Sequence, residues 1–214
     1  EIKAQQISSL SDFVETLSKL PLEFSPGDKW NYSVSTDVLG YLVEHLSGMS
    51  LGDYFKKFIF DPLEMKDTGF SCPEDKLDRL ASLYEHNPKD KPRLLEIPPF
   101  NIRMESGGGG LYSTIKDYHN FCHMLLHEGE FKGRRLIGRK TLELMTTNHL
   151  PNNQDLTEMS ESAFSETPYA GVGFGLGFSV MLDPAKSQTT SDFGEFGWGG
   201  AASPVFMINP KEEM

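Results

Sequence analysis

The sequence predicts an α/β (α+β) architecture with a helical subdomain, and three observations lead to it. Apolar residues recur at helical spacing in several segments of the first part of the chain. Two β-type runs follow near the end. With 214 residues, 38% of them hydrophobic, the chain can bury a sizeable core within the range of one domain. Helical segments followed by strands are typical of layered α/β folds.

The first helices are marked by apolar spacing and by helix breakers. Residues 11–20 place Phe13, Val14, Leu17 and Leu20 on one face, and Pro21 stops the helix. After a turn at residues 26–28, a second helix ends at Gly48. Its expected core face consists of Val38, Leu39, Leu42, Val43 and Leu46. A third helix spans residues 52–60 and is closed by an Asp-Pro pair at 61–62.

The second half combines a loop, a helix and two strands. Residues 73–99 are rich in proline and charge, and we expect a loop there. After the glycine run at 107–110, Ser113 and Thr114 start a helix. Its core face is expected to be Tyr118, Phe121, Cys122, Leu125 and Leu126. Residues 171–178 alternate glycine with apolar residues, and residues 202–208 form a second strand-like run.

Charge and cysteine content exclude several classes of function. The formal net charge of -11 disfavours nucleic acid and anionic lipid as partners, because both require clustered Lys and Arg. Cys72 and Cys122 match no metal or redox spacing, so we expect two free thiols, which do not fix the compartment. No apolar run reaches the roughly 20 residues of a membrane span. Any signal peptide would lie upstream of Glu1, so the localisation is not read from these residues.

Tyr32 is the first candidate for chemistry. It lies in a turn just ahead of a helix, where a phenol can point toward a ligand. A free phenol has a pKa of about 10 and is a poor base at neutral pH, so catalysis requires a neighbouring cation. From these residues alone a structural role is favoured over a catalytic one.

The second candidate is the segment Trp198, Gly199, Gly200 and Ala201, small residues expected at the start of a strand. A substrate could lie along the bare backbone there, and a backbone N–H could stabilise a developing oxyanion. Glycine pairs are also common in plain turns, and the turn is the favoured interpretation on these residues alone.

Three further patterns have weaker support. The glycine run 107–110 lacks the lysine that a phosphate-binding loop requires. His119, His123 and His127 recur along one helical line, but no carboxylate or cysteine completes a ligand set, so a solvated face is favoured over a metal site. Residues 113–116 form the chain's one Ser-x-x-Lys, the pattern of an activated serine nucleophile, and Ser113 fits a helix cap equally well.

Several blocks, taken together, resemble the serine hydrolases of the class C β-lactamase and penicillin-binding-protein group, which includes carboxylesterases. The blocks are residues 20–33 (LPLEFSPGDKWNYS), 37–48 (DVLGYLVEHLSG), 60–70 (FDPLEMKDTGF), 107–114 (GGGGLYST) with Asp117, and 197–200 (GWGG). They run through almost the whole chain in the order typical of the family.

The resemblance implies a fold and a set of roles. The fold is an antiparallel sheet with flanking helices, packed against a helical subdomain with the active site between them. Tyr32 is implied to act with a lysine in proton transfer, and Ala201 to supply an oxyanion amide. Trp198, Gly199 and Gly200 are implied to line the substrate site, in the place of the Lys-Thr-Gly of lactamases.

The same resemblance implies that residues 1–214 are a partial domain, truncated at both ends. The family's Ser-x-x-Lys precedes its tyrosine block, so the nucleophile is expected upstream of Glu1, and Ser113 is then a helix cap. The family also continues beyond Met214 with a further strand and a C-terminal helix. We therefore expect the 214-residue chain itself to be inactive.

Two departures from the family pattern bear on the substrate. Val34 stands two positions after the tyrosine, where lactamases have Asn, and valine cannot hydrogen-bond the amide of a β-lactam. Trp198 replaces the lysine that would meet a substrate carboxylate, and an indole offers an apolar wall with one donor. Both changes favour esters.

The sequence therefore predicts a serine hydrolase that forms an acyl-enzyme on a small ester or amide, most closely a carboxylesterase, with no metal or cofactor. The alternatives are a β-lactamase, a D-amino-acid peptidase, or a catalytically silent homologue that binds a ligand. A metal-dependent hydrolase built on the histidine line is a further rival. The oligomeric state is not read from the sequence.

Overall fold

The computed structural model describes residues 7–86, 90–95, 104–160 and 169–214. The helices are α1 (Leu10–Leu17), α2 (Ser35–Ser47), α3 (Leu51–Phe55), η1 (Lys56–Phe60), η2 (Glu74–Arg79), α4 (Ile115–Leu126), α5 (Arg139–Met145), η3 (Pro151–Asn153), α6 (Leu156–Met159) and α7 (Pro184–Ser187). The strands are β1 (Leu83–Glu85), β2 (Arg93–Leu95), β3 (Glu130–Phe131), β4 (Arg134–Arg135), β5 (Val172–Phe174), β6 (Ser179–Met181), β7 (Phe196–Gly199) and β8 (Val205–Ile208).

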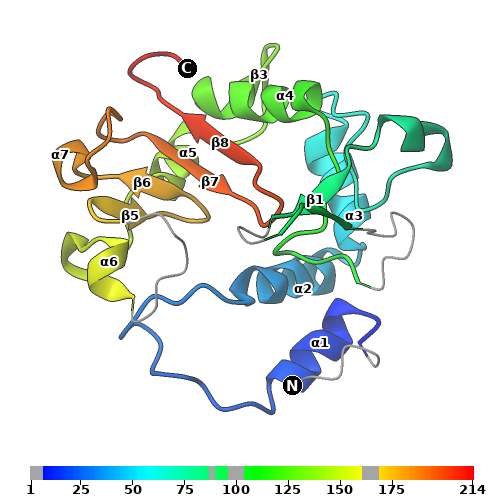
Figure 1. The fold of residues 1–214 in the computed structure, drawn as a ribbon, viewed down its shortest axis with the longest axis horizontal. Helices are drawn as coiled ribbons and strands as arrows, with labels where there is room; N and C mark the ends of the chain where they lie inside the picture. The colour runs from blue at the N-terminus through cyan, green and yellow to red at the C-terminus, as the bar shows by residue number, and fades with distance from the viewer. Residues whose placement is uncertain (1–6, 87–89, 96–103, 161–168) are drawn as a thin grey trace.

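The main sheet is an antiparallel meander with the strand order β5-β6-β7-β8 (Figure 1). Val180 pairs with Phe196, and Phe196 pairs with Ile208, so one row of buried side chains crosses three strands. This row packs against Met124 and Leu125 of α4, which lies over β8. The predicted antiparallel sheet with flanking helices is therefore present.

A second, smaller core holds the helical part together. It consists of Leu10 of α1, Leu51 of α3 and Phe70, with partly buried side chains from α2 around it. α1 and α2 contact each other, and so do α2 and α3. Figure 1 shows α1 and α2 on the side of the molecule away from α4. The helical subdomain predicted from the sequence corresponds to this group.

Helix α1 is shorter than its apolar pattern predicts. The helix ends at Leu17 and its cap residue is Ser18, three positions before Pro21. Leu20 therefore lies outside the helix and is exposed, whereas Leu10, which the pattern omitted, is its buried residue. The hydroxyl of Ser9 accepts a hydrogen bond from the Asp12 amide and so fixes the start at Leu10, one residue earlier than the apolar spacing suggested.

Helix α2 does not turn its apolar stripe toward the core. Val38, Leu39, Leu42 and Leu46 are all exposed, and the buried residues are Asp37 and Gly40. The segment after Met104 occupies the inner side: Ser106 Oγ donates to Asp37 Oδ1 at 2.5 Å. The expected core face of this helix was wrong except at Val43, which packs against the second core, because a polar contact with a glycine-rich segment decides the orientation.

The glycine run 107–110 is explained by this close approach. A Cβ on Gly107 would lie 2.1 Å from the carbonyl oxygen of Thr36, so only glycine fits against the first turn of α2. Gly110 adopts φ of 85°, a left-handed conformation that favours glycine. The run thus has a packing role between α2 and the segment that leads to α4.

The region 73–99 was expected to be a loop, and its described part is more ordered. It contains the 3₁₀ helix η2 and the antiparallel pair β1-β2, in which Tyr84 faces Leu94. Residues 87–89 and 96–99 lie outside the described residues. Pro73 lies immediately before η2, and Asp67 accepts hydrogen bonds from Lys76 and Arg79 of this helix. These contacts leave no periodic pattern of apolar residues in the sequence, so the helix was not predicted.

The third helix, α4 and the strands agree more closely with the sequence. The helix expected at 52–60 is α3, which continues as the π-helical η1. α4 buries Leu125 as expected and also Met124, whereas Tyr118 is partly exposed. The run 171–178 divides into β5 and a turn that leads to β6, and the run 202–208 begins its strand only at Val205. Within the described part of the chain, no helix has the length and apolar character of a membrane span.

Candidate functional site

Tyr32 and Trp198, which lie far apart in the sequence, are brought into ring contact. Their ring centroids are 5.9 Å apart and the rings are nearly parallel, at 15°. Tyr32 lies in the irregular segment before α2, and 43% of its surface is exposed. Trp198 lies on β7 and is half-buried. The predicted tyrosine and the predicted substrate-lining tryptophan therefore belong to one surface.

The residues after Trp198 occupy a hairpin end and not the start of a strand, as the sequence had suggested. Trp198 and Gly199 are the last residues of β7, and Gly200 and Ala201 belong to the turn into β8. The Gly200 amide donates to the Pro204 carbonyl at 2.8 Å and so closes this turn. The sequence analysis placed the strand after these residues and not before them, because a glycine pair can mark either end of a strand.

Bare backbone is accessible beside Trp198. Gly199, Gly200 and Ala201 are all exposed. A Cβ on Gly199 would meet its nearest neighbour only at 3.6 Å, so glycine is not required there by packing inside the fold. An approaching ligand could therefore reach the main chain at this edge, the condition under which backbone N–H groups serve as an oxyanion site.

Three further aromatic residues surround Trp198, and the sequence reasoning missed them. Tyr169 lies nearly parallel to the indole at 6.2 Å, whereas Phe174 and Trp30 meet it edge-on at 5.3 and 6.4 Å. Trp30 also contacts Phe174 at 5.2 Å. The sequence signal for Trp30 was its place two residues before Tyr32. Tyr169 and Phe174 carried no motif, since only the fold brings them to β7.

A buried carboxylate holds the segment that carries Tyr169. Asp155, the N-cap of α6, is 3% exposed and accepts hydrogen bonds from the Gly171 amide and from Lys186 Nζ, both at 2.7 Å. Burial acts to raise the pKa of Asp155, but the bonds from Lys186 and from the Gly171 and Glu158 amides outweigh it and lower that pKa. The two carboxylates of Asp155 and Glu158 raise the pKa of Lys186.

Phe174 is fixed by a side-chain amide. Asn148 Oδ1 accepts a hydrogen bond from the Phe174 amide at 3.0 Å, and the Phe174 carbonyl accepts one from the His149 amide at 2.8 Å. Gly173 leaves the room that this needs, because a Cβ there would lie 2.5 Å from Asn148. The edge strand β5 is thereby anchored to the segment after α5.

Ser113 occupies a structural environment at the start of α4. The N-cap is its neighbour Thr114, whose Oγ1 accepts from the Asp117 amide at 3.1 Å, so the cap assigned to Ser113 was one residue off. The Ser113 hydroxyl lies 2.8 Å from Thr68 Oγ1, which donates to buried Asp117 at 2.9 Å. Asp117 also accepts the Asp67 amide and thus ties the segment after η1 to α4.

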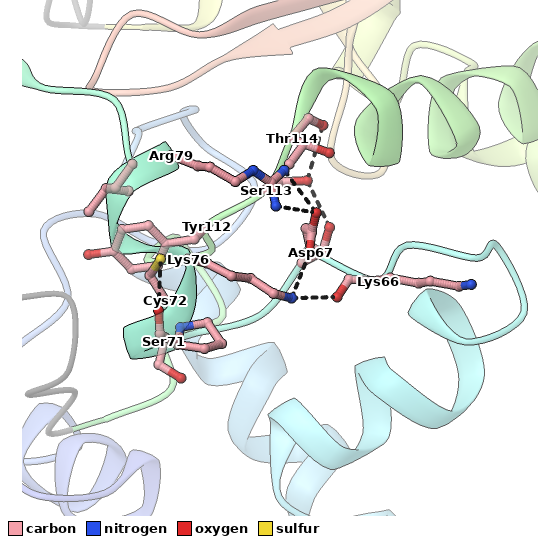
Figure 2. Close-up of a pocket in the computed structure, with 12 residues that line it drawn as sticks. Lys66, Asp67, Ser71, Cys72, Lys76, Arg79, Tyr112, Ser113 and Thr114 are labelled. Carbon is pink, nitrogen blue, oxygen red and sulfur yellow. Dashed lines mark hydrogen bonds and ion pairs between the residues drawn. The ribbon is translucent and has the colours of Figure 1, made fainter.

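Ser113 also lines a cavity of about 130 Å³, shown in Figure 2. Lys76 and Arg79 of η2 project into it and form ion pairs with Asp67, at 2.6 and 3.0 Å. The bonds from these two cations lower the pKa of Asp67. None of the predicted site residues lines this cavity. Asp67 pairs with both cations, so these ion pairs join η2 to the segment after η1.

Among the described residues, the histidines of α4 included, no group of three or more His, Cys, Asp or Glu is arranged to hold a metal ion. The rings of His123 and His127 stack at 3.9 Å. Burial and the neighbouring histidines lower the pKa of His123. Cys72 is buried and Cys122 half-buried, and both are free thiols.

Comparison with known proteins places these features in a family. The family model described as Beta-lactamase matches residues 2–214. Protein Rv1367c of Mycobacterium tuberculosis is 33% identical over 209 residues, covering 94% of this chain and 51% of that protein. Esterase EstB of Burkholderia gladioli is 28% identical, with the same two coverages. The chain spans about half the length of the curated relatives it matches.

Solved structures agree with this assignment. Simvastatin synthase (LovD) from Aspergillus terreus superposes with a TM-score of 0.76 at 25% identity, over 94% of this chain and 53% of that one. A penicillin-binding protein homologue from Pyrococcus abyssi has the same fold, with a TM-score of 0.69. The chain therefore belongs to the beta-lactamase family of serine hydrolases, which includes esterases and penicillin-binding-protein homologues, and it has the β-lactamase/transpeptidase-like fold.

Proposed function

We propose that this chain is the downstream part of a carboxylesterase-like serine hydrolase, whose nucleophile lies in a Ser-x-x-Lys upstream of Glu1. The contact of Tyr32 with Trp198 beside the exposed backbone of Gly199 to Ala201 carries the proposal. It combines a proton-transfer group, an apolar substrate wall and exposed main chain on one surface, the parts that acyl transfer requires apart from the nucleophile.

The proposed reaction has two steps. The upstream serine hydroxyl attacks the ester carbonyl, Tyr32 with the upstream lysine accepts the hydroxyl proton, and the alcohol leaves with a proton returned by the same pair. Water then attacks the acyl-serine and releases the carboxylic acid, which restores the serine. The Ala201 amide donates to the carbonyl oxygen while it carries negative charge. No metal or cofactor takes part.

Two side chains support an ester over a β-lactam. Val34, two residues after Tyr32, is the N-cap of α2 and makes no side-chain cap hydrogen bond, as expected for an apolar group. Its side chain has no hydrogen-bond donor or acceptor for the amide of a β-lactam. Trp198 is surrounded by aromatic rings and presents no cation to a carboxylate. Esterase relatives are consistent with this substrate class.

The test is to label the full-length protein with a fluorophosphonate probe and, in parallel, with a fluorescent penicillin, and to locate the modified peptide by mass spectrometry. We expect the fluorophosphonate on a serine upstream of Glu1. Modification of Ser113 would overturn the assignment of the nucleophile. A folded protein that takes neither probe would favour the catalytically silent homologue.

The 214-residue chain provides the matched control. We expect no turnover of short p-nitrophenyl esters above that of buffer, since a tyrosine and an oxyanion amide without a nucleophile cannot form the covalent intermediate. Turnover by this chain that disappears in Ser113→Ala would show that Ser113 is the nucleophile and would refute the proposal.

A further inference from the structure

We propose that Trp30, Tyr169, Phe174 and Trp198 form a preorganised aromatic surface that selects a neutral ester with a flat apolar group, and that Tyr169 is its specificity-determining residue. This inference rests on the proposed function and names the substrate class of the same site.

The aromatic surface is centred on Trp198 and borders Tyr32. Among the described residues, the indole of Trp198 contacts the rings of Trp30, Tyr169, Phe174 and Tyr32, at centroid distances of 6.4, 6.2, 5.3 and 5.9 Å. All four residues of the surface are half-buried, so each keeps part of its side chain accessible. Aromatic contacts of this kind stabilise the arrangement of the rings beyond the effect of burying their area. The surface therefore keeps its shape and remains open to a ligand.

One short helix anchors two of the four rings. The Trp30 amide donates to the carbonyl of Met159, the last residue of α6, at 3.1 Å. At the first turn of α6, Asp155 accepts the amide of Gly171, and the Val172 amide bonds the Tyr169 carbonyl at 3.1 Å. Gly171 adopts φ of 76°, and a Cβ there would lie 2.4 Å from the Asp183 carbonyl oxygen.

These anchors indicate a surface that is ordered before a ligand arrives. Trp30 and Tyr169 come from segments far apart in the sequence, yet both depend on α6, whereas Phe174 depends on Asn148. A binding surface fixed by backbone and buried side-chain bonds loses little conformational entropy on binding. A rigid surface of this kind is expected in a site that selects its ligands by shape.

The chemistry of the surface selects against anions. The faces of aromatic rings carry partial negative charge and attract apolar groups, ring edges and cations. A carboxylate on the substrate would lose its hydration against these rings and gain only weak donors. An ester with a benzyl or alicyclic group on either side of the carbonyl fits the aromatic surface, and an otherwise identical ester that carries a carboxylate does not.

The chain offers a direct readout, because its two tryptophans are Trp30 and Trp198. Both belong to the aromatic surface, so tryptophan emission reports on this surface alone. We would titrate the 214-residue chain with benzyl acetate and with monobenzyl succinate, which share the benzyl group, whereas the acyl group of the second carries an added carboxymethyl unit with a negative charge. Saturable change is expected with benzyl acetate at concentrations at least tenfold lower than with monobenzyl succinate.

Three variants test the role of Tyr169. Tyr169→Ala should weaken benzyl acetate binding about tenfold, and Tyr169→Phe should retain it, because the ring and not the hydroxyl makes the contact. Tyr54→Ala is the matched control, since Tyr54 is also a half-buried tyrosine but packs on Phe58, away from the aromatic surface. Far-UV circular dichroism checks that each variant is folded. Equal affinity for the two esters, or unchanged binding in a folded Tyr169→Ala, would overturn the proposal.

A second readout separates this inference from the proposed function. In the full-length protein, Tyr169→Ala should raise KM for ethyl phenylacetate severalfold and leave KM for ethyl acetate, which has no ring, unchanged, with similar kcat for both. If the full-length protein hydrolyses no ester while the 214-residue chain still binds benzyl acetate selectively, the proposed function fails and the aromatic surface stands. If esters are hydrolysed without any effect of Tyr169→Ala on selectivity, the aromatic surface fails and the proposed function stands.

Discussion

Tyr32 shows what a motif can predict about one side chain and what it cannot. The block around it pointed to a role in proton transfer, and the fold adds its contact with Trp198. The neighbours that complete the surface came from positions without a motif. The position of Tyr169 depends on the hydrogen bond from the Gly171 amide to Asp155. Asp155 lies sixteen residues before Gly171 and caps a helix, and no sequence pattern predicts this contact.

Removing the hydroxyl of Tyr32 tests its proposed chemistry. In the full-length protein, Tyr32→Phe should lower kcat for p-nitrophenyl acetate by about a hundredfold or more, the usual contribution of a general acid-base group. The phenyl ring retains the contact with Trp198, so the midpoint of thermal unfolding should stay close to that of the parent. Tyr54→Phe serves as the control, with unchanged kcat expected. Full activity in Tyr32→Phe would remove the tyrosine from the mechanism.

Asp155 should make the stability of the protein depend on acid. Its pKa is lowered in the folded state, so its stabilising effect is fully present above the unfolded value, about 3.9, and is lost as the pH falls through the folded value. Because buried Asp155 accepts charge-assisted hydrogen bonds from the Gly171 amide and from exposed Lys186, Asp155→Asn should lower the free energy of unfolding by about 2 kcal/mol at neutral pH.

The measurement is urea unfolding at a series of pH values. The loss of stability caused by Asp155→Asn should begin to shrink below about pH 4, where Asp155 of the unfolded chain becomes protonated, and should vanish once the pH is below the lowered pKa of the folded carboxylate. Asp53→Asn is a control, since Asp53 is an exposed residue of α3. A difference between parent and Asp155→Asn that stays constant down to low pH would contradict the assigned role of the charge.

Among the elements, α2 shows most clearly why pattern and structure differ. Its apolar stripe predicted which face would be buried, but the contacts of Asp37 and Thr36 with the segment that contains the glycine run 107–110 bury a different face. By contrast, α4 and the end strands were predicted well, because their buried side chains face a core formed within this chain. Periodicity reports that a face is apolar, and it does not report which part of a protein covers that face.

The glycine run offers a sharp test of this packing. In Gly107→Ala the new methyl carbon would lie 2.1 Å from the Thr36 carbonyl oxygen unless the backbone shifts. We expect this strain to lower the free energy of unfolding by about 2 kcal/mol. Gly109→Ala is the matched control two residues later, where a Cβ has no neighbour within 4 Å. Chemical denaturation of both variants checks the difference. Equal stability of the two would show that α2 and the glycine run are not packed as described.

The exposed apolar stripe of α2 bears on the association state of the protein in solution. Leu39, Leu42 and Leu46 are 58, 45 and 76% exposed on one helix, and apolar patches of this kind favour association. We expect the 214-residue chain to self-associate as its concentration rises, as measured by sedimentation velocity. Leu39→Glu combined with Leu46→Glu should keep it monomeric. Leu144→Glu, on the exposed side of α5, should not.

The order of the main sheet bears on how the protein folds. β5, β6, β7 and β8 pair only with their neighbours in the chain, so each pairing closes a short loop. The contact of Trp30 with Trp198, in turn, joins two distant parts of the chain and must close a loop that spans most of it. Because long loops close slowly, the sheet is expected to form before the site. In a refolding experiment the backbone signal of the sheet should therefore develop ahead of the tryptophan emission, and the parts that recognise substrate would be the last to reach their places.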